Sequence, residues 1–228
     1  MLLGAFGDSF LFGAELSDLP RGYSKISDSE RIFFHSQKTW PALISKDLNL
    51  DYCCYAVSGI GNQHILDDII CAVASHKNNM LYCINWTWID RFDYIDSVQN
   101  KWKSILPSTE SSTKKLYYKN FHSELHDKIK NLHYIQTAIS LLEKYRCKYV
   151  MTYMDYLLLD EKYHCPKQVN FLQKQIKPHM SNFDNLNFVD WAKKHNFTIS
   201  KLCHPLDEAH QEAKNYWIDH YKQLLLNK

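Results

Sequence analysis

The chain of 228 residues has little of what marks the unusual classes of protein. Six glycines and six prolines are too few for a fibrous or linker-rich protein. Neither sign of charge dominates, with 27 Lys and Arg against 25 Asp and Glu, so the charge favours neither a nucleic-acid coat nor a membrane-surface binder. No apolar run approaches the roughly 20 residues that span a bilayer. We therefore expect no nucleic-acid partner and no membrane span.

The cysteines do not form the patterns that disulfide frameworks or metal sites need. They number seven and include no Cys-x-x-Cys pair, which predicts reduced thiols, mostly buried. Asp8 interrupts the N-terminal apolar stretch almost at once, so the sequence predicts no secretory signal peptide. Together these features predict a cytoplasmic protein.

What the chain does have is material for one large core. Hydrophobic residues make up 45% and aromatic residues 14%, which excludes a disordered chain. No repeat or linker divides it, so we expect a single domain over residues 1–228. Residues 92–120 interrupt the pattern and are expected to form an active-site loop or lid insertion.

Short apolar runs alternate along the chain with segments of helical periodicity. This order is typical of an α/β protein whose central sheet is mostly parallel and covered on both faces. We expect five strands, at residues 1–6, 52–57, 81–84, 149–153 and 187–191. The clearest helix runs from Leu125 to Leu142, where apolar residues recur every three or four positions.

Unusual polar or glycine-containing turns follow three of these strands. They are Gly7-Asp8-Ser9, Ser58-Gly59-Ile60-Gly61-Asn62 and Asn85-Trp86-Thr87. Ligands of an open parallel sheet gather at the carboxyl ends of its strands. The three turns therefore predict a site at one edge of the sheet.

A serine hydroxyl needs a base before it becomes a good nucleophile, and the sequence offers one. Ser9, on its tight turn, is the candidate nucleophile. His210 is the candidate base, and Asp207 lies three residues before it, where it can orient the imidazole. The N–H groups of Ser9 and Gly59 are candidate donors to an oxyanion, with a polar side chain after the third strand.

These residues resemble those of a known family, the SGNH hydrolases or GDSL esterases/lipases. Phe6-Gly7-Asp8-Ser9-Phe10 is similar to the first sequence block of the family. Asp207-x-x-His210, preceded by His204-Pro205, is similar to its last block. Ala56-Val57-Ser58-Gly59 stands where the second block has its oxyanion glycine. The resemblance implies a flavodoxin-like three-layer α/β/α fold and a Ser–His–Asp esterase that needs no metal or other cofactor.

The third block departs from the family pattern. The family has Gly-x-Asn-Asp after the third strand, and this Asn supplies a third oxyanion donor. This chain has Asn85-Trp86-Thr87-Trp88, so Thr87 takes the place of the Asn by register while Asn85 has the right chemistry. The sequence leaves the choice between them open.

The function that follows is a serine esterase acting on a small-molecule or carbohydrate ester, for example by removing O-acetyl groups from carbohydrate. Trp86, Trp88 and Arg91 are candidate substrate-binding residues. A thioesterase or lysophospholipase using the same triad is an alternative, as is a non-hydrolytic binding module with an eroded oxyanion hole. Oligomeric state is left open.

Purely structural roles are alternative interpretations of the candidate catalytic residues. A lone Gly-Asp-Ser is usually only a turn, and Asp207 can simply cap the last helix. Cys203, His204, Asp207 and His210 have side chains that suit zinc, but their spacing matches no common zinc motif, so we expect no metal.

Overall fold

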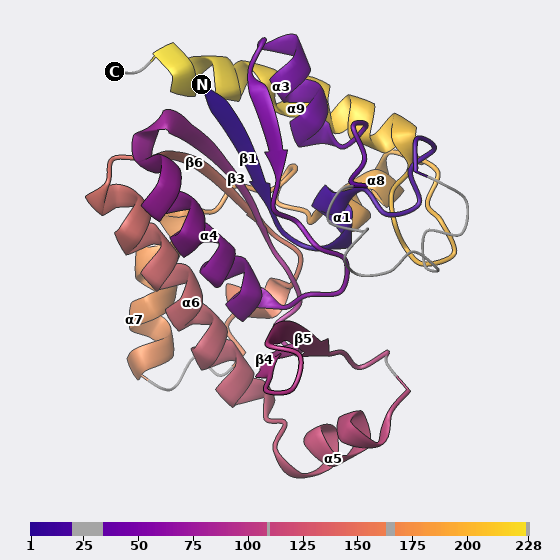
Figure 1. Ribbon diagram of the computed structural model, residues 1–228, viewed down its shortest axis with the longest axis vertical. Coiled ribbons are helices and arrows are strands. Elements are labelled where there is room, and N and C mark those ends of the chain that lie inside the picture. The colour runs from indigo at the N-terminus through magenta and orange to yellow at the C-terminus, as the bar shows by residue number, and fades with distance from the viewer. Residues whose placement is uncertain (20–33, 109, 163–166, 227–228) are drawn as a thin grey trace.

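The protein is built on a four-stranded sheet in which all strands are parallel (Figure 1). The computed structural model describes residues 1–19, 34–108, 110–162 and 167–226. The sheet order is β2-β1-β3-β6. The strands are β1 (Leu2–Phe6), β2 (Asp51–Cys54), β3 (Met80–Trp86) and β6 (Lys148–Tyr153).

The two central strands are apolar on both sides because helices cover both faces of the sheet. Every residue of β3 is buried. Leu3 and Leu81 are paired across β1 and β3, and both face one layer of helices. Phe6 and Ile84, also paired, face the other.

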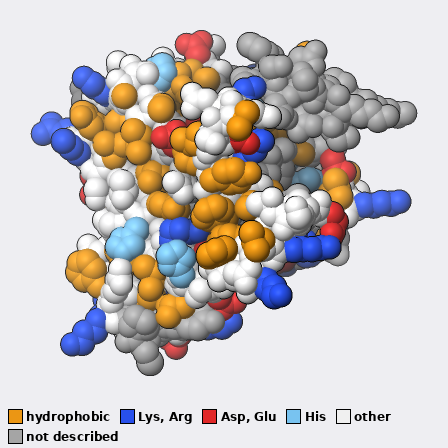
Figure 2. Space-filling view, turned by 60° about the horizontal axis from the view of Figure 1, so that its bottom comes forward, with side chains coloured by type: hydrophobic (Ala, Val, Ile, Leu, Met, Phe, Trp, Pro, Cys, Tyr) orange, Lys and Arg blue, Asp and Glu red, His pale blue; other side chains and the backbone are white. Residues whose placement is uncertain are grey.

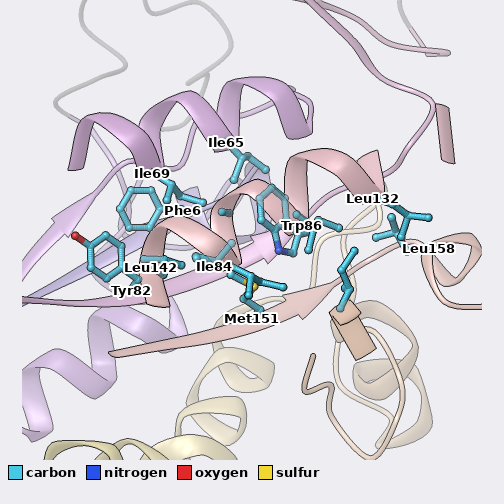
Figure 3. Close-up of a cluster of buried hydrophobic side chains, with 14 of the residues drawn as sticks. Phe6, Ile65, Ile69, Tyr82, Ile84, Trp86, Leu132, Leu142, Met151 and Leu158 are labelled. Atoms are coloured by element: carbon cyan, nitrogen blue, oxygen red, sulfur yellow. The ribbon is translucent and has the colours of Figure 1, made fainter. Parts of the chain in front are cut away.

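One face of the sheet is covered by three helices, α4 (Asn62–His76), α6 (Glu124–Lys144) and α7 (Lys167–Ile176). Ser123 starts α6 by accepting a hydrogen bond from the N–H of His126, as an N-cap residue does. Figure 3 shows the core beneath these helices, where Phe6, Tyr82, Ile84 and Trp86 meet helical Ile and Leu side chains.

In the described part of the chain, four helices cover the opposite face. They are α1 (Ser9–Phe12), α3 (Trp40–Asp47), α8 (Phe188–Lys194) and α9 (Asp207–Leu226). Trp40 of α3 and Trp217 of α9 stack at 6.2 Å between ring centroids. Pro41 lies in the first turn of α3, where its missing N–H costs nothing.

The expected fifth strand at 187–191 is wrong, because this segment begins α8. Asn187 is the N-cap and accepts a hydrogen bond from the N–H of Asp190. Phe188, Val189, Trp191 and Ala192 are the buried residues of the helix, a helical spacing that a five-residue window is too short to reveal. Beyond β6, Met180 instead makes a single parallel bridge to Met151.

The segment at 92–120, outside Thr109, which is not described, is a folded insertion. It contains an antiparallel hairpin, β4 (Phe92–Asp96) with β5 (Lys101–Ile105), followed by α5 (Ser112–Asn120). Asp93 fastens the hairpin to the start of α4 by accepting hydrogen bonds from the N–H groups of Gly61 and His64. A side chain at Gly61 would collide with that carboxylate. That the insertion closes over a substrate stays a prediction.

Figure 2 shows the end of the molecule to which this insertion belongs, where hydrophobic side chains gather beside histidines and Lys or Arg. Large hydrophobic residues of the insertion that are exposed include Ile95, Val98 and Leu116. No helix in the described ranges is long and apolar enough to cross a membrane.

Six of the seven cysteines are described and none of them forms a disulfide. Cys165 lies outside the described residues. Cys83 and Cys147 are buried, whereas Cys71 and Cys203 are exposed, so the expectation of mostly buried thiols is wrong for these two.

Candidate active site

Ser9 lies at the carboxyl end of β1, at the start of α1. Asp8 is the N-cap, and its Oδ1 accepts a hydrogen bond from the N–H of Phe10 at 3.2 Å. Ser9 is 9% exposed. The short helix ends at Gly13, which has a φ of 82°, and an added Cβ there would collide with Ser36.

The histidine that meets Ser9 is His204. Its Nε2 lies 2.8 Å from the Oγ of Ser9. His204 closes a tight turn in which its N–H donates to the Oγ of Ser200 and Cys203 adopts a φ of 66°. The ring also packs edge-on against Phe10, at 5.2 Å between centroids. The histidine that contacts Ser9, which the sequence analysis did not select as the base, thus lies in the turn before α9.

Glu15 is the carboxylate behind His204. Its Oε2 lies 2.6 Å from the Nδ1 of the imidazole and accepts a hydrogen bond from the hydroxyl of Ser200 at 2.5 Å. Partial burial raises the pKa of Glu15, but the hydrogen bonds from Ser200 and His204 outweigh it and lower the pKa below its ordinary value. An ionised Glu15 accepts a hydrogen bond from the Nδ1–H of His204, which leaves Nε2 unprotonated and able to accept a hydrogen bond from the hydroxyl of Ser9.

His210, the expected base, does not reach Ser9. It lies within α9 on the buried face, and its Nδ1 accepts a hydrogen bond from the N–H of Trp40 at 3.1 Å. Burial lowers its pKa to about 3, so the ring is neutral and serves the packing of α3 against α9. The prediction that His210 serves Ser9 as its base is therefore wrong, because the histidine that contacts Ser9 is His204.

Asp207, the expected orienting acid, is likewise engaged elsewhere. Its carboxylate accepts hydrogen bonds from the N–H and the hydroxyl of Ser17 and an ion pair from Lys38 at 2.7 Å. Partial burial raises its pKa, but Lys38 and Ser17 outweigh this and lower it to about 2. Asp207 therefore links the N-terminal segment to α9. Its partners are Ser17 and Lys38, whereas Ser9 contacts His204.

The sequence contains a signal against His210 as the base but none for His204 or Glu15. Ala213, Trp217 and Tyr221 follow His210 at three- and four-residue steps, so the helical period alone places His210 on the buried face. Three residues before His204, where Asp-x-x-His has its acid, stands Lys201. No local pattern indicates Glu15, because its role depends on how two distant turns meet.

Gly59 lies in the turn after β2, as expected for an oxyanion donor. Its φ of 82° is in the left-handed region that favours glycine. Within the described chain, neither its N–H nor that of Ser9 donates a hydrogen bond to another residue. Their assignment as oxyanion donors stays a prediction.

Thr87 does not have a free hydroxyl for an oxyanion. The residue is fully buried, and its Oγ1 donates to the Oδ2 of Asp8 at 2.6 Å. Its N–H and carbonyl are bonded to the side chain of Asn62. The assignment of Thr87 as third donor is therefore corrected: its hydroxyl holds Asp8.

Asn85 belongs to β3 rather than to the turn beyond it. It is 3% exposed, and its Oδ1 accepts a hydrogen bond from the hydroxyl of Thr152 on β6 at 2.8 Å. Its amide nitrogen has no hydrogen-bond partner. Asn85 thus has a spare donor but lies beneath the surface, so its role toward an oxyanion stays a prediction.

Arg91 reaches back from the chain after β3 to the turns after β1 and β2. Its Nη1 lies 3.0 Å from the Oδ2 of Asp8 and donates to the carbonyl of Ile60 at 2.7 Å. The side chain is 10% exposed. Arg91 therefore adjoins both residues that neighbour the expected backbone donors.

The two candidate substrate-binding tryptophans differ in burial. Trp86 is fully buried in the core beneath α4 and α6, so its assignment to substrate is wrong. Trp88 is partly exposed and lies at 6.3 Å from Phe10 between ring centroids. Both Trp88 and Phe10 line a cavity of about 600 Å³, a volume typical of small-molecule sites.

This cavity, which we call the side cavity, adjoins the Ser9–His204 pair, because Phe10 and Cys203 both line it. Its other walls are apolar groups, three polar or basic side chains and four carboxylates. The polar and basic side chains belong to Tyr156, Asn187 and Lys193, and the carboxylates belong to Asp90, Asp155, Asp160 and Asp190. The Oδ1 of Asp90 has no hydrogen-bond partner, and burial is the main cause that raises the pKa of this residue. The remaining three carboxylates are hydrogen-bonded within the protein.

The four residues considered for zinc point in separate directions. His204 is on Ser9, Asp207 on Ser17 and His210 on Trp40. In the ranges described, no group of three or more His, Cys, Asp or Glu residues is arranged to hold a metal ion.

Solved structures resemble the whole chain. A structure of TesA superposes with a TM-score of 0.53 at 14% identity, covering 98% of this chain and 99% of that one. The psychrotrophic esterase EstA from Pseudoalteromonas sp. gives 0.52 at 10% identity, over 99% of both chains. A carbohydrate esterase, described as having divergent catalytic and non-catalytic binding functions in its active site, gives 0.50 at 15% identity over 97% of this chain and 68% of that one. No family model and no curated protein matches the sequence. The chain has the α/β/α fold of the SGNH hydrolases.

Proposed function

We propose that the protein is a serine ester hydrolase in which Ser9, His204 and Glu15 form the triad. The observation that carries the proposal is the continuous chain of contacts from the Oγ of Ser9 through both nitrogens of His204 to the Oε2 of Glu15. Nucleophile, base and orienting acid lie in the order that acyl transfer needs. The fold shared with solved esterases supports it.

In this mechanism the Oγ of Ser9 attacks the ester carbonyl carbon while the Nε2 of His204 takes its proton. The N–H groups of Ser9 and Gly59 stabilise the tetrahedral oxyanion. Collapse breaks the bond to the alcohol, which leaves with the proton from His204. Water then attacks the acyl-enzyme, His204 again removes a proton, and Ser9 is restored as the carboxylic acid departs.

The side cavity is proposed to hold the alcohol part of the ester. Aromatic rings from Phe10 and Trp88 offer flat apolar surfaces, and the carboxylates of Asp160 and Asp190, whose side chains are 38% and 39% exposed, can accept hydrogen bonds from hydroxyl groups. Such walls suit a polyhydroxy alcohol, and their carboxylates oppose an anionic one. We infer that the substrate is a small acyl ester of a neutral carbohydrate, such as an O-acetyl sugar.

The first test is the hydrolysis of p-nitrophenyl acetate and of an acetylated sugar by the wild type and by Ser9→Ala. We expect the variant to lose activity by about 10⁴-fold or more on both esters, since the remaining groups cannot replace the nucleophile. Circular dichroism checks that the variant is folded. Full activity in Ser9→Ala would contradict the proposal.

A second comparison separates the alternative substrates. The proposal expects acetyl esters to react faster than octanoyl esters and neutral sugar acetates faster than acetyl-coenzyme A, whose phosphates meet the acidic walls. The reverse order would favour a thioesterase or lysophospholipase. Saturable glycan binding without turnover would favour a binding module.

A further inference from the structure

We propose that Arg91 is a positioning residue of the oxyanion site, which it serves by holding the Gly59 turn against the Ser9 turn. The inference rests on the proposed function, because it needs an oxyanion at Ser9. It concerns the part of the site where the chain departs from the family pattern, after β3.

The contacts of Arg91 join two turns through a single nitrogen. Nη1 donates to the carbonyl of Ile60, the residue after Gly59, at 2.7 Å. The same nitrogen lies 3.0 Å from the Oδ2 of Asp8, the residue before Ser9. Each expected backbone donor therefore adjoins one of the two groups that Arg91 binds.

Among the described residues, the other hydrogen bonds of the Gly59 turn lie at its ends, while the side chain of Ile60 is buried in the core. At its start, the N–H of Val57 donates to the carbonyl of Gly7 at 3.1 Å. At its end, the N–H of Gly61 donates to Asp93 at 2.8 Å. An added Cβ at Gly59 would find only Leu106, at 3.9 Å. Arg91 thus supplies the hydrogen bond that holds the main chain in the middle of the turn.

Burial makes this arrangement hard to relax. Asp8 is fully buried and Arg91 is 10% exposed at its side chain. Removing one partner of such a pair leaves the other charge buried and uncompensated. Thr87 adds a second donor to the same oxygen of Asp8, at 2.6 Å. The turn after β1 and the chain after β3 therefore meet at one carboxylate, and Arg91 links the turn after β2 to it.

This arrangement explains how the site works with a threonine where the family has its amide donor. A donor stabilises an oxyanion only when it is fixed in place before the charge develops. Thr87 and Arg91 donate nothing to the oxyanion here. They fix Asp8 and Ile60, and thereby the N–H groups of Ser9 and Gly59.

The experiment compares Arg91→Met and Arg91→Lys with the wild type on p-nitrophenyl acetate. We expect Arg91→Met to lower kcat by about 10²-fold, the typical effect of losing one oxyanion donor, while KM changes by less than about threefold. Arg91→Lys keeps the positive charge on a shorter side chain, so we expect its kcat to lie between those of Arg91→Met and the wild type. Added guanidinium ion, well below denaturing concentrations, should partly restore kcat in Arg91→Met but not in Ser9→Ala.

Lys214→Met is the matched control for the loss of a partly buried cation. Lys214 is 14% exposed and pairs at 2.8 Å with Asp47, the last residue of α3, so its loss affects stability without touching the turns. We expect it to keep the wild-type kcat. A second readout is the rate at which a phosphonate ester labels Ser9, which should fall in parallel with kcat in Arg91→Met.

Two results would overturn the role of Arg91 separately from the proposed function. One is a kcat in Arg91→Met within a few-fold of wild type, while Ser9→Ala is inactive. The other is a loss that appears in KM alone. If Arg91→Met fails to fold, Arg91→Lys and Arg91→Gln decide the matter, and wild-type kcat in both would reject the role. Activity that survives in Ser9→Ala would reject the proposed function and this role with it.

Discussion

The turn that carries His204 and the helical turn that carries His210 lie six residues apart and give their histidines opposite surroundings. His204 is partly exposed and lies between a hydroxyl and a carboxylate. His210 is 2% exposed and faces a main-chain N–H among aromatic rings. The same side chain contacts the candidate nucleophile in one place and packs between two helices in the other. What differs is the backbone path, since one residue precedes the helix and the other follows its first turn.

Separate substitution of each histidine tests this difference most directly. We expect His204→Ala to lower kcat/KM by about 10⁴-fold or more, because Ser9 then has no base. His210→Gln is expected to stay within about tenfold of wild type, because an amide oxygen can still accept the hydrogen bond from Trp40. Ester hydrolysis by both variants measures the difference, and a larger loss in the His210 variant would reverse the assignment.

The two carboxylates provide the next contrast. Glu15→Gln removes the charge behind His204, and we expect kcat to fall by about 10²- to 10⁴-fold, as when the acid of a triad is replaced by its amide. Asp207→Asn should change kcat by no more than a few-fold, since Asp207 contacts Ser17 and Lys38 instead. Equal losses in the two variants would contradict the geometry of the triad.

A smaller effect on stability sharpens the contrast between the histidines. Because burial lowers the folded-state pKa of His210 from 6.5 to about 3, protonation favours the unfolded chain. Its contribution is fully present above pH 6.5 and is lost as the pH falls toward 3. Between pH 7 and pH 5 the loss amounts to about 2 kcal/mol in the free energy of unfolding.

Denaturant unfolding at the two pH values measures this effect. His210→Gln should lose less stability than the wild type on going from pH 7 to pH 5, because it has no group to protonate at that position. Identical losses in wild type and His210→Gln would show that another group is responsible.

Much of the fold could be predicted from the sequence because burial leaves a local pattern. Strands β1 and β3 are covered on both faces, so they appear as apolar runs, and the period of α6 reveals its inner side. The site was harder. Ser9 follows from a glycine turn at a strand end, but Glu15 has a φ of 68° and reaches His204 only because the turn at 200–204 folds back over it. That meeting depends on tertiary packing, which no spacing records.

The error at His210 has the same origin. Asp207 and His210 lie one helical turn apart, which is near enough for the spacing to predict a pair. In the fold, α9 presents Asp207 to Ser17 and His210 to α3. Spacing shows which residues share a turn of helix, while the neighbours of that helix decide what each residue contacts.

The contact between Ser9 and His204 joins positions 195 residues apart in the sequence. Ser9 follows β1, whereas His204 lies in the segment before α9. The two residues therefore meet only after that segment has docked against the sheet that contains β1. Contacts of such separation form late, since their loop-closure entropy must first be overcome. A chain whose central sheet is complete but whose last helix is still loose would hold an unactivated serine. The rate at which Ser9 becomes reactive toward an active-site reagent during refolding would thus report the docking of this last segment. Spectroscopic probes of helix content would miss that step.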